Sequence, residues 1–205
     1  IPGLLNGEPV SVWNDKSSSL NNAYNIGSLR PTYQTNVVNG LPVVRFGGSP
    51  QYLIMTSAVS SVLPFSIFHV YKKRVSGGLM FTLTNSSDNN SYTMFDYSDG
   101  NLYNFTRGNA FGNAAGKGNV TSFWIGSQIS NTGTNNVTGY KNGVDVSFSY
   151  AGGGSGTLVN YDWLGHRTTE YADGDLAEIL FYNSALSTTD RQNVENYLNK
   201  KYAIF

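Results

Sequence analysis

The sequence has no cysteine, few charged residues and no long apolar run, and each absence excludes a class of protein. Without cysteine there is no disulfide framework, no thiolate nucleophile and no cysteine-based zinc site. Charged residues make up 13% of the 205 residues and the formal net charge is zero, so nothing attracts a phosphate backbone or an anionic membrane. No apolar run approaches the roughly 20 residues that span a bilayer. We therefore expect no nucleic acid partner and no membrane insertion.

The residues that take the place of charges favour many short strands joined by turns. The chain holds 23 Gly, 14 Tyr and 11 Phe, and it is rich in Asn, Ser and Thr. No repeat, linker or charge block divides it, so we expect one domain over residues 1–205. Because the chain begins with Ile1 rather than Met, we expect that domain to be a processed or excised part of a larger protein.

The segment 173–182 is the best strand candidate and the one around which the rest is organised. After Asp175, every residue up to Tyr182 except Glu178 is apolar, small or aromatic, which predicts a central strand covered on both faces. Asp173-Gly174 is expected to form a tight turn into it. In the segment 65–71, alternation places His69 on the same face as Phe65, which predicts a buried, structural histidine.

A hairpin and a helix complete the pattern. The turn at Asn142-Gly143 predicts a hairpin whose core face carries Val137, Val144 and Val146, with Tyr140 on the face turned to solvent or a ligand. After residue 186, Ser187 has the pattern of an N-cap with an acid in the first turn, and helical apolar spacing continues to residue 202. The residues thus predict an all-β chain closed by one C-terminal α-helix.

Several segments, in order along the chain, carry a resemblance to a known family. They are Asn6-Gly-Glu-Pro-Val-Ser-Val-Trp13, Arg30-Pro-Thr-Tyr33, Asn39-Gly-Leu-Pro-Val-Val-Arg-Phe46, and Gly174-Asp-Leu-Ala-Glu-Ile179 followed by a helix ending Lys201-Tyr-Ala-Ile204. The chain resembles the LamG-like branch of the concanavalin A-like lectin/glucanase superfamily, found in bacterial extracellular proteins and on phage or virus surfaces. The middle of the chain, roughly 80–135, resembles the family only in the spacing of its predicted strands. The resemblance implies a jelly-roll sandwich of two antiparallel sheets, located outside the cell, at the cell surface or on a virion surface.

Sugar recognition needs aromatic faces for stacking and polar groups for hydroxyls, so aromatic and polar residues in or beside loops, or on polar faces, are the candidates. The expected ligand-binding residues are Tyr97, Tyr103, Tyr140, Trp163, Arg167 and Tyr171. For Tyr140 and Trp163 a core position fits the pattern equally well, whereas Trp13 and Trp124 are assigned to the core. His166, at a strand end, is expected at the surface.

Acidic residues decide between binding and catalysis. Glycanases of the superfamily place two acids at alternate positions of one strand. In the enzymes that retain the configuration of the sugar, the two carboxyl groups lie roughly 5 Å apart. The only alternating pair here is Asp173 and Asp175, and since the family motif repeats Asp175, a turn-capping role is expected. Glu178, among apolar neighbours, is expected to be a hydrogen-bonded structural carboxylate. We therefore expect no enzyme activity and no catalytic residue.

Calcium is the metal that the superfamily often uses, bound by oxygen ligands from loops. Asp96, Asp99 and Asn101, spaced along a turn, offer three such oxygens, although Asp-Gly turns also occur without metal. No other cofactor is expected.

The functional expectation is a non-catalytic module that binds carbohydrate or a cell-surface glycan. Its partners would be a glycan or cell-surface receptor, together with neighbouring domains or subunits of a larger assembly. The alternative is a structural or adhesion domain of a virion, fibre or other surface assembly. A glycan hydrolase or lyase is the third possibility, disfavoured by the missing acid pair.

Overall fold

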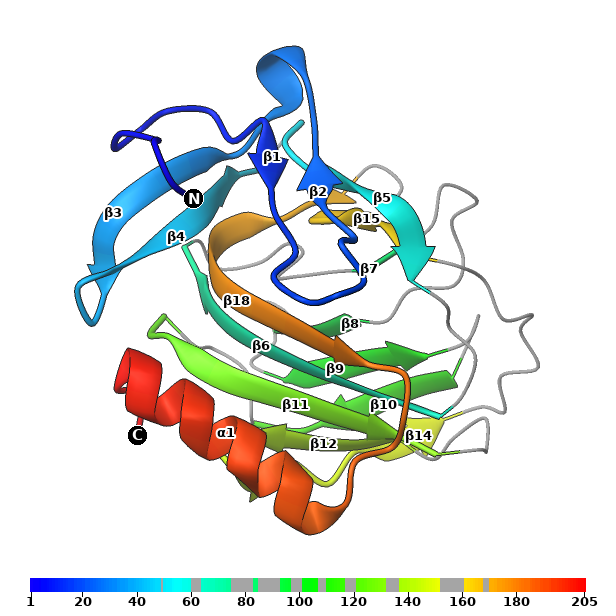
Figure 1. The fold of residues 1–205 in the computed structure, drawn as a ribbon. Coiled ribbons are helices and arrows are strands. Elements are labelled where there is room, and N and C mark those ends of the chain that lie inside the picture. The colour runs from blue at the N-terminus through cyan, green and yellow to red at the C-terminus, as the bar shows by residue number, and fades with distance from the viewer. Residues whose placement is uncertain are drawn as a thin grey trace.

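The computed structural model describes residues 1–48, 50–59, 64–74, 83–84, 93–96, 101–106, 110–116, 121–131, 137–151, 161–167 and 170–205. In these ranges strands predominate, every strand pair is antiparallel, and a single α-helix closes the chain (Figure 1). The described part of the chain contains no helix long and apolar enough to cross a membrane.

The larger layer is a seven-stranded sheet in the order β13-β12-β11-β6-β18-β4-β3. Its strands are β3 (Thr32–Val38), β4 (Leu41–Gly47), β6 (Phe65–Lys73), β11 (Trp124–Ser130), β12 (Val137–Lys141), β13 (Val144–Asp145) and β18 (Asp173–Tyr182). The central strand is β6, and its neighbour β18 pairs with it from Gly174 to Tyr182 with one bulge. The segment chosen from sequence as the organising strand is therefore a long inner strand of this sheet.

The second layer consists of two smaller sheets. One is five-stranded, in the order β1-β2-β5-β15-β7, and contains β1 (Val12–Trp13), β2 (Ala23–Tyr24), β5 (Leu53–Val59), β15 (Tyr161–Leu164) and β7 (Leu83–Thr84). The other is four-stranded, in the order β14-β10-β9-β8, and contains β14 (Ser149–Ala151), β10 (Ala110–Ala114), β9 (Leu102–Thr106) and β8 (Thr93–Asp96). A short pair, β16 (His166–Arg167) and β17 (Glu170–Tyr171), and a 3-10 turn, η1 (Gly27–Leu29), complete the described elements.

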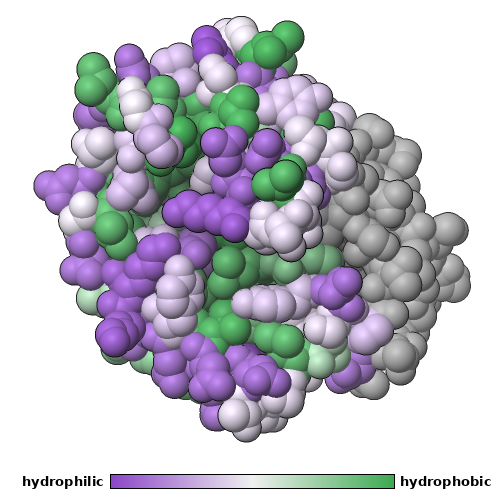
Figure 2. Space-filling model, in the orientation of Figure 1, coloured by the Kyte–Doolittle hydropathy of each residue, from purple (hydrophilic) through white to green (hydrophobic). Residues whose placement is uncertain are grey.

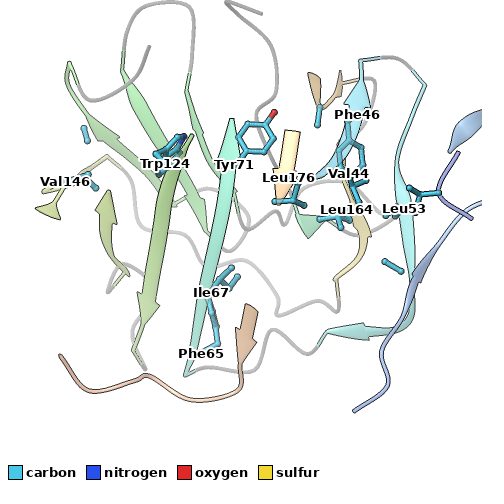
Figure 3. Close-up of a cluster of buried hydrophobic side chains, with 14 residues drawn as sticks. Val44, Phe46, Leu53, Phe65, Ile67, Tyr71, Trp124, Val146, Leu164 and Leu176 are labelled. Atoms are coloured by element: carbon cyan, nitrogen blue, oxygen red, sulfur yellow. The ribbon is translucent and has the colours of Figure 1, made fainter. Parts of the chain in front are cut away.

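The main core lies between the two layers (Figure 3). Tyr71, Trp124 and Leu176 enter it from the larger sheet, and Leu53 and Leu164 enter it from the five-stranded sheet. Trp124, Tyr71, Leu176 and Leu53 are each 0% exposed, so burying them contributes substantially to stability. This arrangement confirms the expected all-β sandwich with one C-terminal helix.

The helix α1 (Thr188–Tyr202) covers the outer face of the seven-stranded sheet (Figure 1). Leu198 and Tyr202 pack there in a second cluster with Phe68, Val70 and Ile125. The Ser187 hydroxyl accepts a hydrogen bond from the backbone N–H of Asp190 at 3.1 Å, which confirms the expected N-cap. One face of the large sheet therefore meets the sandwich core and the other meets α1.

One local prediction about β18 was wrong. The expected turn at Asp173-Gly174 is part of β18, where an added Cβ at Gly174 would stand 1.9 Å from the Tyr71 hydroxyl, so glycine is needed for close approach and not for a turn. Only Asp173–Leu176 of β18 pairs with β4, but the expected cover on both faces is confirmed: Ile179 and Phe181 pack against the main core, and Leu180 and Tyr182 pack against the cluster beneath α1.

The predicted core position of Val144 was also wrong. Val144 is 65% exposed, whereas Val137 and Val146 are buried as expected. The reason is that β13 is the edge strand of its sheet and has only two residues, so no further strand or layer covers Val144.

Candidate functional site

A line of side chains crosses the outer face of the five-stranded sheet. In β5, Leu53 points into the core, so its neighbour Ile54 faces outward. The pairing register aligns Val12 with Tyr24, Tyr24 with Ile54 and Ile54 with Trp163. These four residues, which we call the outer row, come from four neighbouring strands. Val12 and Tyr24 are 41% and 38% exposed, and Figure 2 shows apolar residues at the surface over β1, among polar neighbours.

An aromatic cluster adjoins the Trp163 end of the outer row. The Trp163 ring lies 4.4 Å from the His166 ring and 5.6 Å from the Tyr52 ring, measured between centroids. The His166 ring stacks in turn on Tyr171 at 4.4 Å with an interplanar angle of 18°. His166 and Tyr171 are cross-strand partners of β16 and β17, so the short pair holds the two rings face to face.

Gly165 makes this cluster possible. It has a φ of +86°, and an added Cβ there would stand 2.7 Å from the Phe46 ring. Only glycine adopts this backbone conformation readily, and only glycine leaves space for Phe46. The chain can then turn sharply between Leu164, which points into the core, and His166, which packs on Trp163.

Polar groups around the row fall into two kinds. Some are committed to fixing the loop after β2: the Asn25 side-chain amide donates to the Tyr52 carbonyl at 2.8 Å, and Arg30 donates to the Ser11 hydroxyl at 2.8 Å. By contrast, the hydroxyl groups of Tyr24, Tyr52 and Tyr171 make no hydrogen bond with any described residue. Within the described part of the chain, these three hydroxyls have no hydrogen-bond partner at the edges of the rings.

The structure brings together only some of the predicted ligand-binding residues. Trp163 and Tyr171 meet in the aromatic cluster, and the backbone of Arg167 follows His166 in β16, although its side chain lies outside the described part. The backbone of Tyr103 lies in β9 of the other small sheet, its side chain not being described, and Tyr97 lies outside the described residues. Tyr140 faces α1 on the far side of the sandwich core.

Sequence reasoning missed Tyr24, Tyr52 and the true position of His166. His166 is 6% exposed, so the expectation of a surface histidine was wrong: its ring is covered by Tyr52, Trp163 and Tyr171. The alternation of Tyr52 with the core residue Leu53 was a usable signal for Tyr52. Nothing local in the sequence marks Tyr24, because its place in the row depends on the pairing of β2 with β5.

The acidic residues of β18 have structural partners. Asp175, 1% exposed, accepts two hydrogen bonds from Arg45, at 2.6 and 2.9 Å, so both its oxygens are occupied. Glu178 accepts hydrogen bonds from Lys201 and Tyr202, each at 2.8 Å, and from Tyr197 at 3.1 Å. The expected role of Glu178 as a hydrogen-bonded structural carboxylate is therefore confirmed, and α1 supplies its partners.

The predicted calcium ligands are only partly within the described chain. Asp99 and the side chain of Asp96 lie outside it, and the Asn101 amide oxygen accepts a hydrogen bond from the Gly116 N–H at 2.9 Å. The described residues also hold no group of three His, Asp or Glu side chains suited to a metal ion. The described residues thus do not assemble a calcium site, and calcium at this turn stays a prediction.

Comparison with known proteins relates the chain to others by fold alone. No family model and no curated protein sequence matches it. Among solved structures, the binding domain of Paraclostridial Mosquitocidal Protein 1 matches with a TM-score of 0.66, 15% identity, 94% of this chain and 51% of that one. The receptor binding domain of botulinum neurotoxin D matches with a TM-score of 0.63, 13% identity, 92% of this chain and 52% of that one.

A Trypanosoma rangeli sialidase in complex with the inhibitor DANA also matches, with a TM-score of 0.62 and 12% identity. The match covers 94% of this chain and 31% of the sialidase, so the chain spans about a third of that enzyme and about half of the toxin domains. At these identities the shared feature is a β-sandwich of the lectin-like class, which agrees with the concanavalin A-like fold that the sequence resembles.

Proposed function

We propose that this protein is a non-catalytic module that binds neutral glycans at a cell surface through the outer row and the adjoining aromatic cluster. The observation that carries the proposal is the register that places Val12, Tyr24, Ile54 and Trp163 in one line across four strands. Apolar and aromatic side chains suit the C–H faces of sugar rings, and the tyrosine hydroxyls beside them suit sugar hydroxyl groups.

The spacing of the two rings in the row suits consecutive sugar residues. Neighbouring strands lie about 4.8 Å apart, so Tyr24 and Trp163, two strands apart, are separated by about 10 Å. That is comparable with the length of a disaccharide unit in an extended chain. Because strands twist by roughly 20–25° from one to the next, the two ring planes differ in direction, which favours a twisted single chain over a flat crystalline surface.

The binding would be weak and without charge. Dissociation constants in the millimolar to micromolar range correspond to about 4–8 kcal/mol, which one or two stacked rings and a few hydrogen bonds can supply. The chain has a formal net charge of zero and 13% charged residues, which suits a neutral hydroxylated ligand better than nucleic acid or lipid.

Family and location are part of the same proposal. We infer that residues 1–205 form one LamG-like module of a larger protein, exposed outside the cell or on a virion surface. Two of the similar structures are the binding domain of a mosquitocidal protein and the receptor binding domain of a neurotoxin, which supports a role in attachment to a receptor or glycan. The alternative, a structural domain of a surface assembly, needs no ligand at the outer row.

A glycan array with the purified chain tests the proposal. We expect neutral oligosaccharides among the hits. Tyr24→Ser should weaken their binding at least several-fold, whereas Tyr24→Phe should retain the part of the affinity that comes from stacking on the ring. Trp163→Ala should also weaken them, with a melting curve recorded because Trp163 packs on His166. Phe205→Ser is the matched control, since Phe205 is 56% exposed and lies outside the row.

An array without neutral hits from the folded chain would favour the structural alternative. Equal binding by wild type, Tyr24→Ser and Trp163→Ala would place any binding elsewhere on the molecule. Release of reducing ends from a bound polysaccharide by the purified chain would contradict the non-catalytic part of the proposal.

A further inference from the structure

A separate cavity of about 230 Å³ lies on the opposite side of the sandwich core from the outer row. Its lining residues come from the segment that joins β18 to α1, from the first turn of α1, from the end of β11 and from β12. Its polar walls are Asn131, Thr138, Tyr140, Thr188 and Arg191. It therefore contains Tyr140, one of the predicted ligand-binding residues that the aromatic cluster does not include.

Arg191 forms a fixed and electrically balanced wall of this cavity. It is 4% exposed, and its guanidinium carbon lies 3.6 Å from the centre of the Tyr140 ring. Its Nη1 donates to Glu195, which is 3% exposed and also accepts from the Ser127 hydroxyl at 2.6 Å. Because Glu195 neutralises Arg191 and Tyr140 stacks on its guanidinium, this wall is held rigidly and carries no free positive charge.

The other polar walls bring hydroxyl and amide groups to the cavity. The side chains of Asn131, Thr138 and Thr188 and the hydroxyl of Tyr140 make no hydrogen bond with the residues that the structure describes. They come from three separate segments of the chain and converge on one space. A few convergent polar groups in a cavity are the pattern of a site for a small ligand.

The apolar walls narrow the chemistry further. Ile129, Ala185 and Leu186 line the same cavity, so a ligand meets C–H contacts as well as hydroxyl and amide groups. A sugar ring has both kinds of surface. The positive end of the α1 dipole, which would favour an anion, is already complemented by Asp190 in the first turn, and Arg191 is already paired with Glu195, so an anion is disfavoured. A volume of about 230 Å³ lies below the roughly 300–1,000 Å³ of sites for drug-sized ligands, which suits a single ring.

We propose that this cavity is a second carbohydrate site that holds the terminal residue of a neutral glycan. It does not depend on the outer row: the row would bind along an extended chain, whereas the cavity would hold one end residue. Since the two sites face away from each other across the core, one copy of the chain could hold two glycans at once.

Backbone ¹H–¹⁵N spectra of the whole chain, titrated with methyl glycosides of glucose, galactose, mannose and N-acetylglucosamine, test the proposal. We expect at least one glycoside to shift the signals of Ile129, Thr138, Tyr140 and Thr188, which line the cavity. A disaccharide with the same sugar at its non-reducing end should shift the same signals. A ligand that binds only as a monosaccharide would overturn the assignment to a glycan terminus.

Conservative variants make the test specific. Thr138→Val, Thr188→Val and Tyr140→Phe each remove one hydroxyl and keep the shape, so each should weaken binding by about two- to tenfold. Thr189→Val is the matched control, because Thr189 is the next residue of α1, is also exposed and does not line the cavity. Tyr24→Ser should leave the titration unchanged, which separates this site from the outer row.

Three results would overturn the proposal. They are the absence of shifts at the cavity residues with every glycoside, equal binding by the wild type and a Thr138→Val/Thr188→Val double variant, and tighter binding of acetate or inorganic phosphate at the same residues. Shifts produced equally by glycerol would overturn the assignment to a sugar ring. None of these results bears on array hits that depend on Tyr24.

Discussion

Arg45 and Asp175 form a two-point ion pair across neighbouring strands, with Arg45 Nε 2.6 Å from Asp175 Oδ1 and Nη2 2.9 Å from Oδ2. The two residues are register partners in β4 and β18, so the pair joins the N-terminal half of the chain to its last strand. Asp175 is 1% exposed, and its charge depends on this partner.

We expect Arg45→Met to lower the free energy of unfolding by about 3 kcal/mol, because it leaves a buried carboxylate unpaired. The double variant Arg45→Met/Asp175→Leu should recover most of the loss, since it removes the charge as well. Urea denaturation at pH 7 measures both. A double variant less stable than the single one would show that the ion pair itself stabilises the fold, and that the loss does not come from the unpaired carboxylate of Asp175.

The Tyr202–Glu178 contact predicts a loss of stability at high pH. Burial, and after it the charge of Glu178, raises the pKa of Tyr202 above its ordinary value of 10.0. Above about pH 10 the unfolded chain therefore releases this proton while the folded chain keeps it, so the free energy of unfolding falls as the pH rises. The pKa of Lys201 is raised too: burial lowers it, but hydrogen bonds to Glu178 and Tyr197 outweigh that effect.

Denaturation curves between about pH 9 and pH 11 test this. Tyr202→Phe should lose about 1.5–3 kcal/mol at neutral pH, the range for a hydrogen bond to a charged group, and should then decline less steeply above pH 10. Tyr197→Phe is the control, because Tyr197 is 49% exposed and donates to the same carboxylate. Parallel declines for wild type and Tyr202→Phe would contradict the assignment.

His69 predicts the opposite dependence at low pH. Complete burial lowers its pKa from 6.5 to about 3, and its ring meets the Trp124 ring edge-on at 4.9 Å. The unfolded chain therefore binds a proton at this residue below pH 6.5 that the folded chain does not, so stability falls as the pH drops from 6.5 towards 3. By pH 5 the loss should be about 2 kcal/mol.

The variant His69→Gln should remove the part of this pH dependence that His69 contributes between about pH 7 and pH 5. His166→Gln, at the other histidine, is the comparison. If the slope disappears with His166→Gln and persists with His69→Gln, the acid sensitivity belongs to the aromatic cluster instead of the core.

Local patterns were sufficient for the fold and insufficient for the site. A continuous run of apolar, small and aromatic residues identified the inner strand 173–182, and Ser187 with Asp190 marked the start of α1, because each signal lies within a few neighbouring residues. The outer row joins residues 12, 24, 54 and 163, whose alignment exists only after β1, β2, β5 and β15 pair. Gly174 was misread for the same reason: the Tyr71 hydroxyl that requires it is 103 positions away in the sequence (174 − 71).

The end of α1 offers a stabilising substitution. Ala203 has the left-handed conformation, with φ 53° and ψ 58°, and its N–H donates to the Asn199 carbonyl. A side chain in this conformation costs roughly 1–2 kcal/mol, so Ala203→Gly should raise the free energy of unfolding by about 1 kcal/mol.

Asn142→Gly is the control for this prediction. Asn142 also has a positive φ of 51°, but its side-chain oxygen accepts a hydrogen bond from the Ile125 N–H at 2.9 Å. That variant should therefore lose stability, and a gain at Asn142 would show that its hydrogen bond contributes nothing.

Salt dependence separates the glycan proposal from any charge-driven attachment. Stacking and hydrogen bonds to Tyr24, Tyr52 and Tyr171 involve no ion pair, so the dissociation constant of an array hit should change less than about twofold between low and high salt. Attachment through Arg167 or the lysines of α1 to an anionic polymer would instead weaken steeply with salt, as counterion release requires. Calorimetry at about 0.05 M and about 0.5 M sodium chloride, with and without a calcium chelator, distinguishes the cases. Strong weakening by salt would contradict a neutral ligand, and loss of binding with chelator alone would show that the turn at Asp96, Asp99 and Asn101 holds calcium that the site needs.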